Sequence, residues 1–158
     1  IDSEGGIVDK FLGDGLMAFF GAFDETINPS AAGVRAGLNM LKKLEILNQR
    51  WQEQGEETFR IGIGIHTGEV KVGNIGSPNK MEYTIIGDAV NLTSRLQDKT
   101  KVLKETILIS DAVCYELTDE IIVEDKGIEE IRGRSPIRVY AVRSQKTRIF
   151  TGEKQDGK

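Results

Sequence analysis

Two apolar, β-prone segments, residues 7–12 and 16–20, flank the tripeptide Gly13-Asp14-Gly15 near the start of the chain. Because glycine adopts positive φ angles at no steric cost, this centre predicts a tight β-hairpin. Alternate residues of a strand point to one face, so Lys10 and Asp14 are expected to serve the same side of the hairpin. Two interpretations stay open from these residues alone: a charged site built on a hairpin, or an ordinary exposed turn beside a lysine.

Length and charge narrow the classes of protein to consider. The 158 residues fit one domain with a substantial core. A net charge of −4 offers no basic surface for duplex nucleic acid, so no nucleic-acid partner is expected. No apolar run reaches the ~20 residues of a membrane span, and no signal-peptide pattern occurs. With a single cysteine, Cys114, we expect a cytoplasmic location and no membrane contact by this domain.

The middle of the chain alternates between helix and strand patterns. Asn28-Pro29-Ser30 predicts the start of a helix that runs to about Gln54. Residues 58–67 alternate with a period of two and predict a strand, and residues 69–76 are expected to complete a hairpin with it. One face of the first strand carries only Gly62 and Gly64, which allows another backbone to approach closely.

The remaining pattern defines the fold class. Helices are expected at 88–98, with Asp88 as N-cap, and at 110–117, and strands at 81–86, 106–109, 120–124, 126–132 and 136–142. Hairpins interrupted by helices predict an α+β fold: one mixed, mainly antiparallel sheet with helices packed on it.

Three polar features of these elements are candidates for function. Asn91 and Arg95 are spaced i, i+4, so they lie one above the other on a helix and could hold a sugar phosphate, or could simply be a solvated pair. His66 is the sole histidine and is more simply a structural residue than a metal ligand. The cations at 132, 134 and 138 fit a solvated turn.

Three separated patterns together resemble the class III nucleotidyl cyclase catalytic domain. They are Val8-Asp-Lys-Phe-Leu-Gly-Asp-Gly-Leu-Met-Ala-Phe-Phe-Gly21, Ile63-Gly-Ile-His-Thr-Gly68 and Tyr83-Thr-Ile-Ile-Gly-Asp-Ala-Val-Asn-Leu-Thr-Ser-Arg-Leu96. The resemblance covers about residues 5–143 and implies a ferredoxin-like core. It also implies a head-to-tail homodimer whose sites are built from both chains. We therefore expect a catalytic domain over 1–143 and a flexible tail over 144–158.

The resemblance also assigns roles to side chains. Asp14 matches one of two aspartates that hold two divalent ions, Mg²⁺ or Mn²⁺. Lys10 and Thr84 match the pair that recognises the purine, in a combination similar to adenine-selecting cyclases; threonine at this position resembles a subgroup that is often bicarbonate-responsive.

The residues that the resemblance implies for ribose and phosphate binding lie on the helix expected at 88–98 and later in the chain. Asn91 and Arg95 match the pair that orients the ribose and steadies the α-phosphate. Arg132 stands where the family commonly has a lysine for the terminal phosphates. These matches imply conversion of ATP to 3′,5′-cyclic AMP and pyrophosphate, in a protein that also carries a fused sensory domain.

Two departures from the family pattern limit this expectation. The first metal aspartate of the family lies on a strand before the hairpin, and no residue here matches it. We therefore expect this second metal ligand to lie upstream of Ile1, the chain to begin inside the domain, and its activity as it stands to be low. Glu69 occupies a position where some relatives have a phosphate-contacting arginine. An inactive nucleotide-binding or dimerisation module is therefore an alternative, and a guanylyl cyclase is a second alternative that Lys10 disfavours.

Overall fold

The computed structural model describes residues 1–23, 27–118 and 120–145, and within them a four-stranded sheet forms the centre of the fold. Its strand order is β3 (Ile63–Ile65), β6 (Ile107–Ser110), β8 (Ile137–Gln145) and β7 (Ile121–Glu129). β3 and β6 are parallel, whereas β8 is antiparallel to both β6 and β7. The predicted α+β class with a mixed, mainly antiparallel sheet is confirmed.

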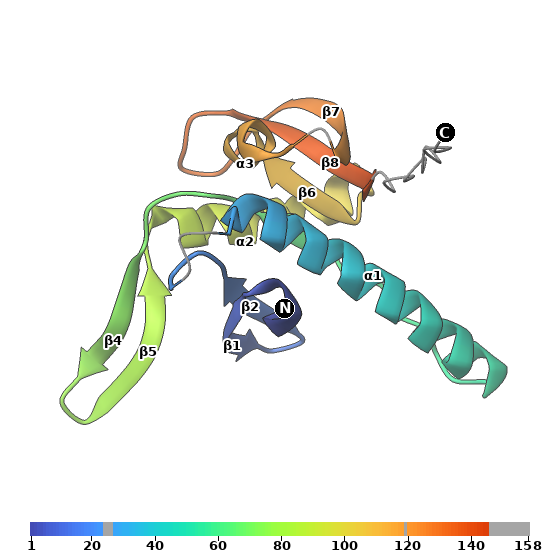
Figure 1. The fold of residues 1–158 in the computed structure, drawn as a ribbon, viewed down its shortest axis with the longest axis horizontal. Coiled ribbons are helices and arrows are strands. Elements are labelled where there is room, and N and C mark those ends of the chain that lie inside the picture. Colours follow the sequence, from blue (N-terminus) through green and yellow to red (C-terminus); the bar gives the residue numbers. More distant parts are fainter. Residues whose placement is uncertain (24–26, 119, 146–158) are drawn as a thin grey trace, which may run out of the picture.

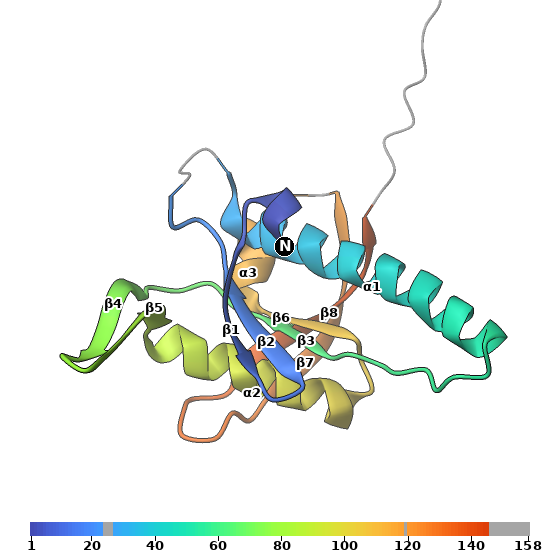
Figure 2. The ribbon, with the colours of Figure 1, turned by 90° about the horizontal axis from the view of Figure 1, so that it is seen from below.

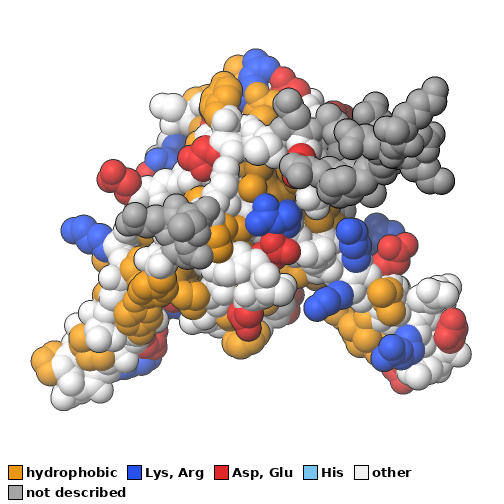
Figure 3. Space-filling view, in the orientation of Figure 1, with side chains coloured by type: hydrophobic (Ala, Val, Ile, Leu, Met, Phe, Trp, Pro, Cys, Tyr) orange, Lys and Arg blue, Asp and Glu red, His pale blue; other side chains and the backbone are white. Residues whose placement is uncertain are grey.

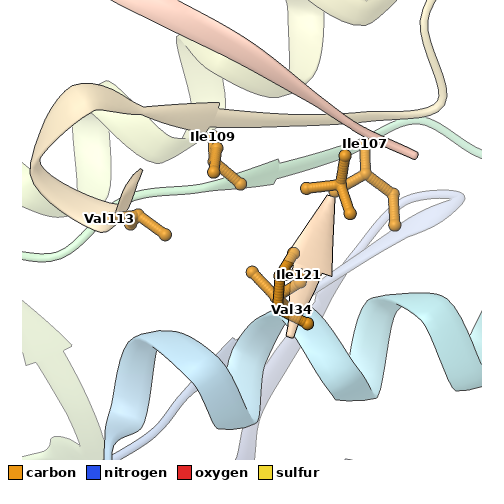
Figure 4. Close-up of a cluster of buried hydrophobic side chains, with 6 residues drawn as sticks. Val34, Ile107, Ile109, Val113 and Ile121 are labelled. Atoms are coloured by element: carbon orange, nitrogen blue, oxygen red, sulfur yellow. The ribbon is translucent and has the colours of Figure 1, made fainter. Parts of the chain in front are cut away.

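Helices cover both faces of this sheet, as Figure 2 shows with α1 (Pro29–Glu53) and α2 (Asp88–Leu103) on opposite sides. Successive residues of β6 explain the arrangement, because neighbouring side chains of a strand point to opposite faces. Ile107 and Ile109 pack with Val34 of α1 and with Val113 of the short helix α3 (Asp111–Glu116), as Figure 4 shows. Leu108, between them, packs on the other face against Leu92 and Leu96 of α2.

Helix α1 begins and ends where the sequence predicts. The Asn28 side chain accepts a hydrogen bond from the backbone N–H of Ala31, and Pro29 occupies the first turn. The helix ends at Glu53, and Gly55 follows with a φ of 74°. All buried residues of α1 lie between Ser30 and Gly37, and the second half of the helix projects from the domain in Figure 1.

Two hairpins lie outside the four-stranded sheet. The predicted hairpin around Gly13-Asp14 is confirmed: β1 (Ile7–Leu12) pairs antiparallel with β2 (Gly15–Phe19), after the short 3-10 helix at Asp2–Glu4. The second hairpin joins β4 (Lys71–Ser77) to β5 (Lys80–Ile86) and projects as an arm in Figure 1. The expected hairpin between 58–67 and 69–76 is wrong, because β3 is only three residues long and pairs in parallel with β6 instead.

Other boundaries also differ from the sequence prediction. The strands expected at 120–124 and 126–132 are a single strand, β7, with an irregularity between Asp125 and Gly127 that absorbs the extra residue. Asp88 is the first residue of α2 rather than its cap, which is Gly87 without a side-chain hydrogen bond. β8 includes 144 and 145, the first residues of the expected tail, and 146–158 lie outside the described residues. No helix in the described part of the chain is long and apolar enough to span a membrane.

The two glycines at β3 let α2 lie directly on the strand, as the sequence predicts. A Cβ built on Gly64 would stand 2.4 Å from the backbone nitrogen of Gln97 and 2.6 Å from the carbonyl oxygen of Thr93. A Cβ on Gly62 would stand 2.1 Å from the Thr100 hydroxyl oxygen. Helix backbone, which cannot rotate away as a side chain can, therefore replaces side-chain packing at this interface.

Substitution of these glycines tests the interface. Gly64→Ala is expected to lower the free energy of unfolding by about 3 kcal/mol, because α2 must move to admit one methyl group. Gly73→Ala in β4 is the matched control, since no atom lies within 4 Å of its Cβ position. Urea denaturation measures both variants, and equal effects of the two would contradict the close helix–strand approach.

Candidate functional site

A buried carboxylate links the two hairpins. The Asp9 side chain is 0% exposed, and its Oδ2 accepts a hydrogen bond from the Thr84 hydroxyl at 3.0 Å. Lys10 Nζ lies 3.7 Å from the same Oδ2 and 3.6 Å from Glu82 Oε2. β1 supplies Asp9 and Lys10, and β5 supplies Glu82 and Thr84. The predicted pair of Lys10 and Thr84 is therefore brought into one cluster.

Access to this cluster differs among its members. Thr84 is only 6% exposed, whereas the Lys10 side chain is 34% exposed. Lysine offers three hydrogen-bond donors and no acceptor, so the open side of the cluster presents donors to a ligand. The Asp9 side chain, in contrast, is enclosed, and its contacts are with Thr84 and Lys10.

Asp9 is the residue that the sequence prediction missed. It stands inside an apolar strand beside Lys10, and its hydrogen-bond partner is 75 positions away. Its second oxygen, Oδ1, is buried and has no partner among the described residues. Because an unpaired buried polar atom costs stability, such atoms are uncommon and call for a reason.

Asp14 lies at the exposed turn between β1 and β2, next to Gly13 with its φ of 63°. The described residues hold no group of three or more His, Cys, Asp or Glu side chains that could bind a metal. Mg²⁺, however, is commonly held by one or two carboxylates together with waters and substrate phosphates. Asp14 therefore fits one oxygen ligand of an ion that arrives with a phosphorylated substrate.

Ile1 supports the turn that leads into β1. Its backbone carbonyl accepts hydrogen bonds from the N–H groups of Glu4 at 2.9 Å and Gly6 at 3.2 Å. Its side chain packs beside Gly6, where an added Cβ would stand 2.9 Å from Ile1 Cγ2. An isoleucine side chain offers no oxygen to a metal ion, so the role of Ile1 is structural. The expectation of a second metal aspartate upstream of Ile1 stays a prediction.

The second group of polar residues lies on α2 and on the loop between β7 and β8. Asn91 is exposed and Arg95 is half-buried one turn further along α2. The Arg95 guanidinium lies against that loop, because a Cβ on Gly133 would stand 3.9 Å from its Nη1. Arg132 is the exposed residue next to Gly133.

An open groove of about 560 Å³ follows this loop. Its walls are formed by Lys99, Glu130, Ile131, Arg132, Gly133, Arg134 and Pro136. An ion pair between Arg134 and Asp88, the first residue of α2, anchors the loop to the helix, and Lys99 pairs with Glu129 at 2.6 Å. The Arg132 and Arg95 guanidiniums have no carboxylate ion-pair partner among the described residues, so this edge can bind an anion.

His66 takes a structural position between these elements. Its Nδ1 lies 2.8 Å from the hydroxyl oxygen of Ser110, which caps α3. Burial, with a smaller contribution from Arg134, lowers the pKa of His66 below its ordinary value. The contact with Ser110 and the partial burial of the ring support the expectation that His66 is structural.

The site residues thus form separate groups within one chain. Lys10 and Thr84 meet at the hairpins, whereas Asn91, Arg95 and Arg132 border α2 and the β7–β8 loop. Within the described residues, no hydrogen bond or ion pair joins Asp14 to either group.

Comparison with protein families matches residues 7–144 to the adenylate and guanylate cyclase catalytic domain. An adenylate cyclase of Dictyostelium discoideum, specific to terminal differentiation, is 32% identical over 99% of this chain and 7% of its own length. Adenylate cyclase 1 of Rhizobium meliloti is 30% identical over 90% of this chain and 22% of its own. The chain therefore spans less than a third of these curated relatives.

Solved structures of both specificities share the fold. The adenylyl cyclase CyaB from P. aeruginosa superposes with a TM-score of 0.81 at 37% identity, covering 91% of this chain and 74% of that one. The guanylyl cyclase Cya2 superposes with a TM-score of 0.80 at 31% identity, covering 99% and 76%. Since the two scores are so close, the fold does not distinguish the two substrates.

Removal of the Thr84 hydroxyl tests the buried cluster without any ligand. Thr84→Val is expected to lower the free energy of unfolding by about 1–3 kcal/mol, because the enclosed Asp9 carboxylate loses its hydrogen-bond donor. Thr93→Val is the control, since the Thr93 hydroxyl bonds only the Ala89 carbonyl of its own helix. Urea denaturation that shows no larger effect at 84 than at 93 would contradict the cluster.

Proposed function

Because the chain belongs to the adenylate and guanylate cyclase catalytic domain family, we propose that it converts ATP to 3′,5′-cyclic AMP and pyrophosphate. The observation that carries the choice of ATP is the cluster in which Lys10 and Thr84 meet. We further propose that each site is built from two copies of the chain.

The base is proposed to bind at Lys10 and Thr84. The Lys10 ammonium can donate to N1 of adenine, which is an acceptor, but would oppose the N1–H donor of guanine. The half-exposed ammonium is held in place by Asp9 and Glu82 on either side. A fixed donor distinguishes the two purines better than a mobile one, because it cannot turn away from a mismatched edge.

The ribose and phosphates are proposed to bind along α2 and the β7–β8 loop. Negative charge builds on the α-phosphate oxygens as the ribose 3′-oxygen attacks, and a preorganised cation stabilises that charge. Arg95 is suited to this task because its guanidinium lies near Gly133 and, within the described part of the chain, pairs with no carboxylate. Asn91 can orient the ribose from the preceding turn, and Arg132 can hold the terminal phosphates.

Asp14 is proposed as a ligand of divalent cations, two Mg²⁺ or Mn²⁺ ions per site. When bound, such ions lower the pKa of the attacking hydroxyl and hold the triphosphate. The turn at Gly13 keeps the Asp14 carboxylate exposed on the hairpin, where it can bind ions carried by a nucleotide.

Exposed apolar side chains on both hairpins support the proposed homodimer. They are Val8, Phe11, Leu12 and Leu16 on β1–β2, and Val72, Met81, Tyr83 and Ile86 on β4–β5. Figure 3 shows hydrophobic side chains along the projecting β4–β5 arm. Large apolar side chains exposed in such number on two hairpins are typical of an interface, and a second copy of the chain is the partner that a divided site requires.

A nucleotide-binding module without turnover is the second candidate, favoured by the lack of a three-ligand metal group in the described residues. An assay of the chain, and of a version extended upstream of Ile1 by a strand carrying the expected first aspartate, separates the candidates. With Mn²⁺, we expect cyclic AMP from the extended protein to exceed cyclic GMP. Cyclic GMP in excess would overturn the choice of ATP, and binding without any product would support the module.

Arg95→Ala tests the proposed phosphate side. We expect turnover of ATP by the extended protein to fall about 100-fold or more, with a much smaller change in nucleotide affinity, because the cation acts on charge that develops in the transition state. Arg50→Ala, at the exposed last turn of α1, is the matched control. A rate unchanged by Arg95→Ala would remove Arg95 from the mechanism.

A further inference from the structure

The Thr84 hydroxyl carries one proton, and Asp9 takes it. The donor–acceptor distance to Asp9 Oδ2 is 3.0 Å. A hydroxyl has one O–H donor and two acceptor lone pairs, so once the proton is committed the oxygen can only accept. Because Thr84 is 6% exposed and Asp9 is enclosed, water cannot readily replace the carboxylate and free the proton.

We infer that Asp9 is a positioning residue that sets the purine selectivity of the site by fixing the Thr84 hydroxyl as an acceptor. This inference rests on the proposed binding of the base at Lys10 and Thr84. Adenine presents an amino group, a donor, at the position where guanine presents a carbonyl oxygen, an acceptor. An oxygen that can only accept pairs with the adenine amino group and leaves the guanine carbonyl facing another acceptor.

Fixing the Thr84 hydroxyl as an acceptor requires an aspartate, and not an asparagine, at position 9. A carboxylate has no proton to offer, so it cannot return a donor to Thr84 and reverse the polarity of the hydroxyl. An asparagine of the same shape could donate its amide N–H to the Thr84 oxygen, and the hydroxyl proton would then be free for a guanine oxygen. Among the described residues, Asp9 Oδ1 has no hydrogen-bond partner. This fits a residue whose value lies in its hydrogen-bonding polarity toward Thr84, since its second oxygen contributes no bond to the described fold.

Glu82 provides a comparison that separates the hydrogen bond of Asp9 to Thr84 from the negative charge of Asp9 beside Lys10. Both carboxylates lie at nearly the same distance from Lys10 Nζ, 3.7 Å for Asp9 and 3.6 Å for Glu82. Only Asp9 bonds the Thr84 hydroxyl. Glu82 is 53% exposed and its charge is more screened than that of the enclosed Asp9, so it measures how far a change of charge beside Lys10 alone alters purine selectivity.

The test measures equilibrium binding of 3′-deoxy-ATP and 3′-deoxy-GTP, which lack the attacking hydroxyl, so selectivity is read without turnover. Selectivity is expressed as the dissociation constant of the guanine nucleotide divided by that of the adenine nucleotide. We expect Asp9→Asn to reduce this ratio about tenfold or more, because the adenine nucleotide binds more weakly and the guanine nucleotide more tightly. Glu82→Gln is expected to lower this ratio by a much smaller factor, because it loosens Lys10 but leaves the Thr84 hydroxyl committed to Asp9. In a Thr84→Val background, Asp9→Asn is expected to change the ratio no more than Glu82→Gln does, because only the contact with Lys10 remains to be lost.

The outcomes separate this inference from the proposed function. A folded Asp9→Asn protein that keeps the wild-type ratio, or a Glu82→Gln protein that loses it equally, overturns the inference and leaves the site intact. A protein with the wild-type site, extended upstream of Ile1 as for the activity assay, that binds neither nucleotide refutes the proposed site and the inference with it. If Asp9→Asn does not fold, as judged by circular dichroism, Asp9→Ala is the second variant, and it is expected to lower the ratio because the hydroxyl is then free to turn.

Discussion

The contact between α2 and β3 is the constraint on which the candidate site depends. Gly62 and Gly64 remove the side chains that would separate the helix from the strand, so the backbone of α2 rests on the sheet. That position brings the start of α2 to the β7–β8 loop, where Asp88 pairs with Arg134. It also turns Arg95 toward Gly133 of the same loop. The placement of Arg95 at this edge therefore depends on Gly64 of β3 and on Gly62, which directly precedes the strand.

The hairpins form the other part of the site and are linked by polar contacts instead of a shared sheet. Asp9 and Lys10 of β1 meet Thr84 and Glu82 of β5, while the apolar side chains of both hairpins remain exposed. Burying that apolar surface against a second copy would stabilise the dimer and would bring groups that are separate in one chain to a common ligand. Site assembly and dimerisation are in this view the same event.

Local signals predicted the parts of the fold that depend on neighbouring residues. The Gly13-Asp14 turn, the Asn28 cap and the bare face of Gly62 and Gly64 each rest on residues close in sequence, and the structure confirms all three. The pairing of β3 with β6 joins residues more than 40 positions apart, and the alternating pattern of a strand does not identify its partner. The sequence therefore favoured the nearer strand, and that prediction was wrong.

The same limit applies to the candidate site. Lys10, Thr84, Asn91 and Arg95 could be named from the resemblance to the family, but their distribution over separate groups could not. Asp9 was missed because burial and a partner 75 positions away give it its importance, and neither can be read from one strand. Lone acidic residues within apolar strands that adjoin a candidate cation are the signal that could have found it.

Mixing two inactive variants tests most directly whether the site is shared between chains. Both variants, Asp14→Ala and Arg95→Ala, are made in the extended protein. Each variant by itself is expected to have almost no turnover of ATP. When they are mixed, about half of the dimers contain one of each, and each such dimer keeps one intact site, so about a quarter of wild-type turnover is expected to return. Turnover that stays absent, while light scattering and exchange of labelled chains show that mixed dimers form, would contradict a site built from two copies.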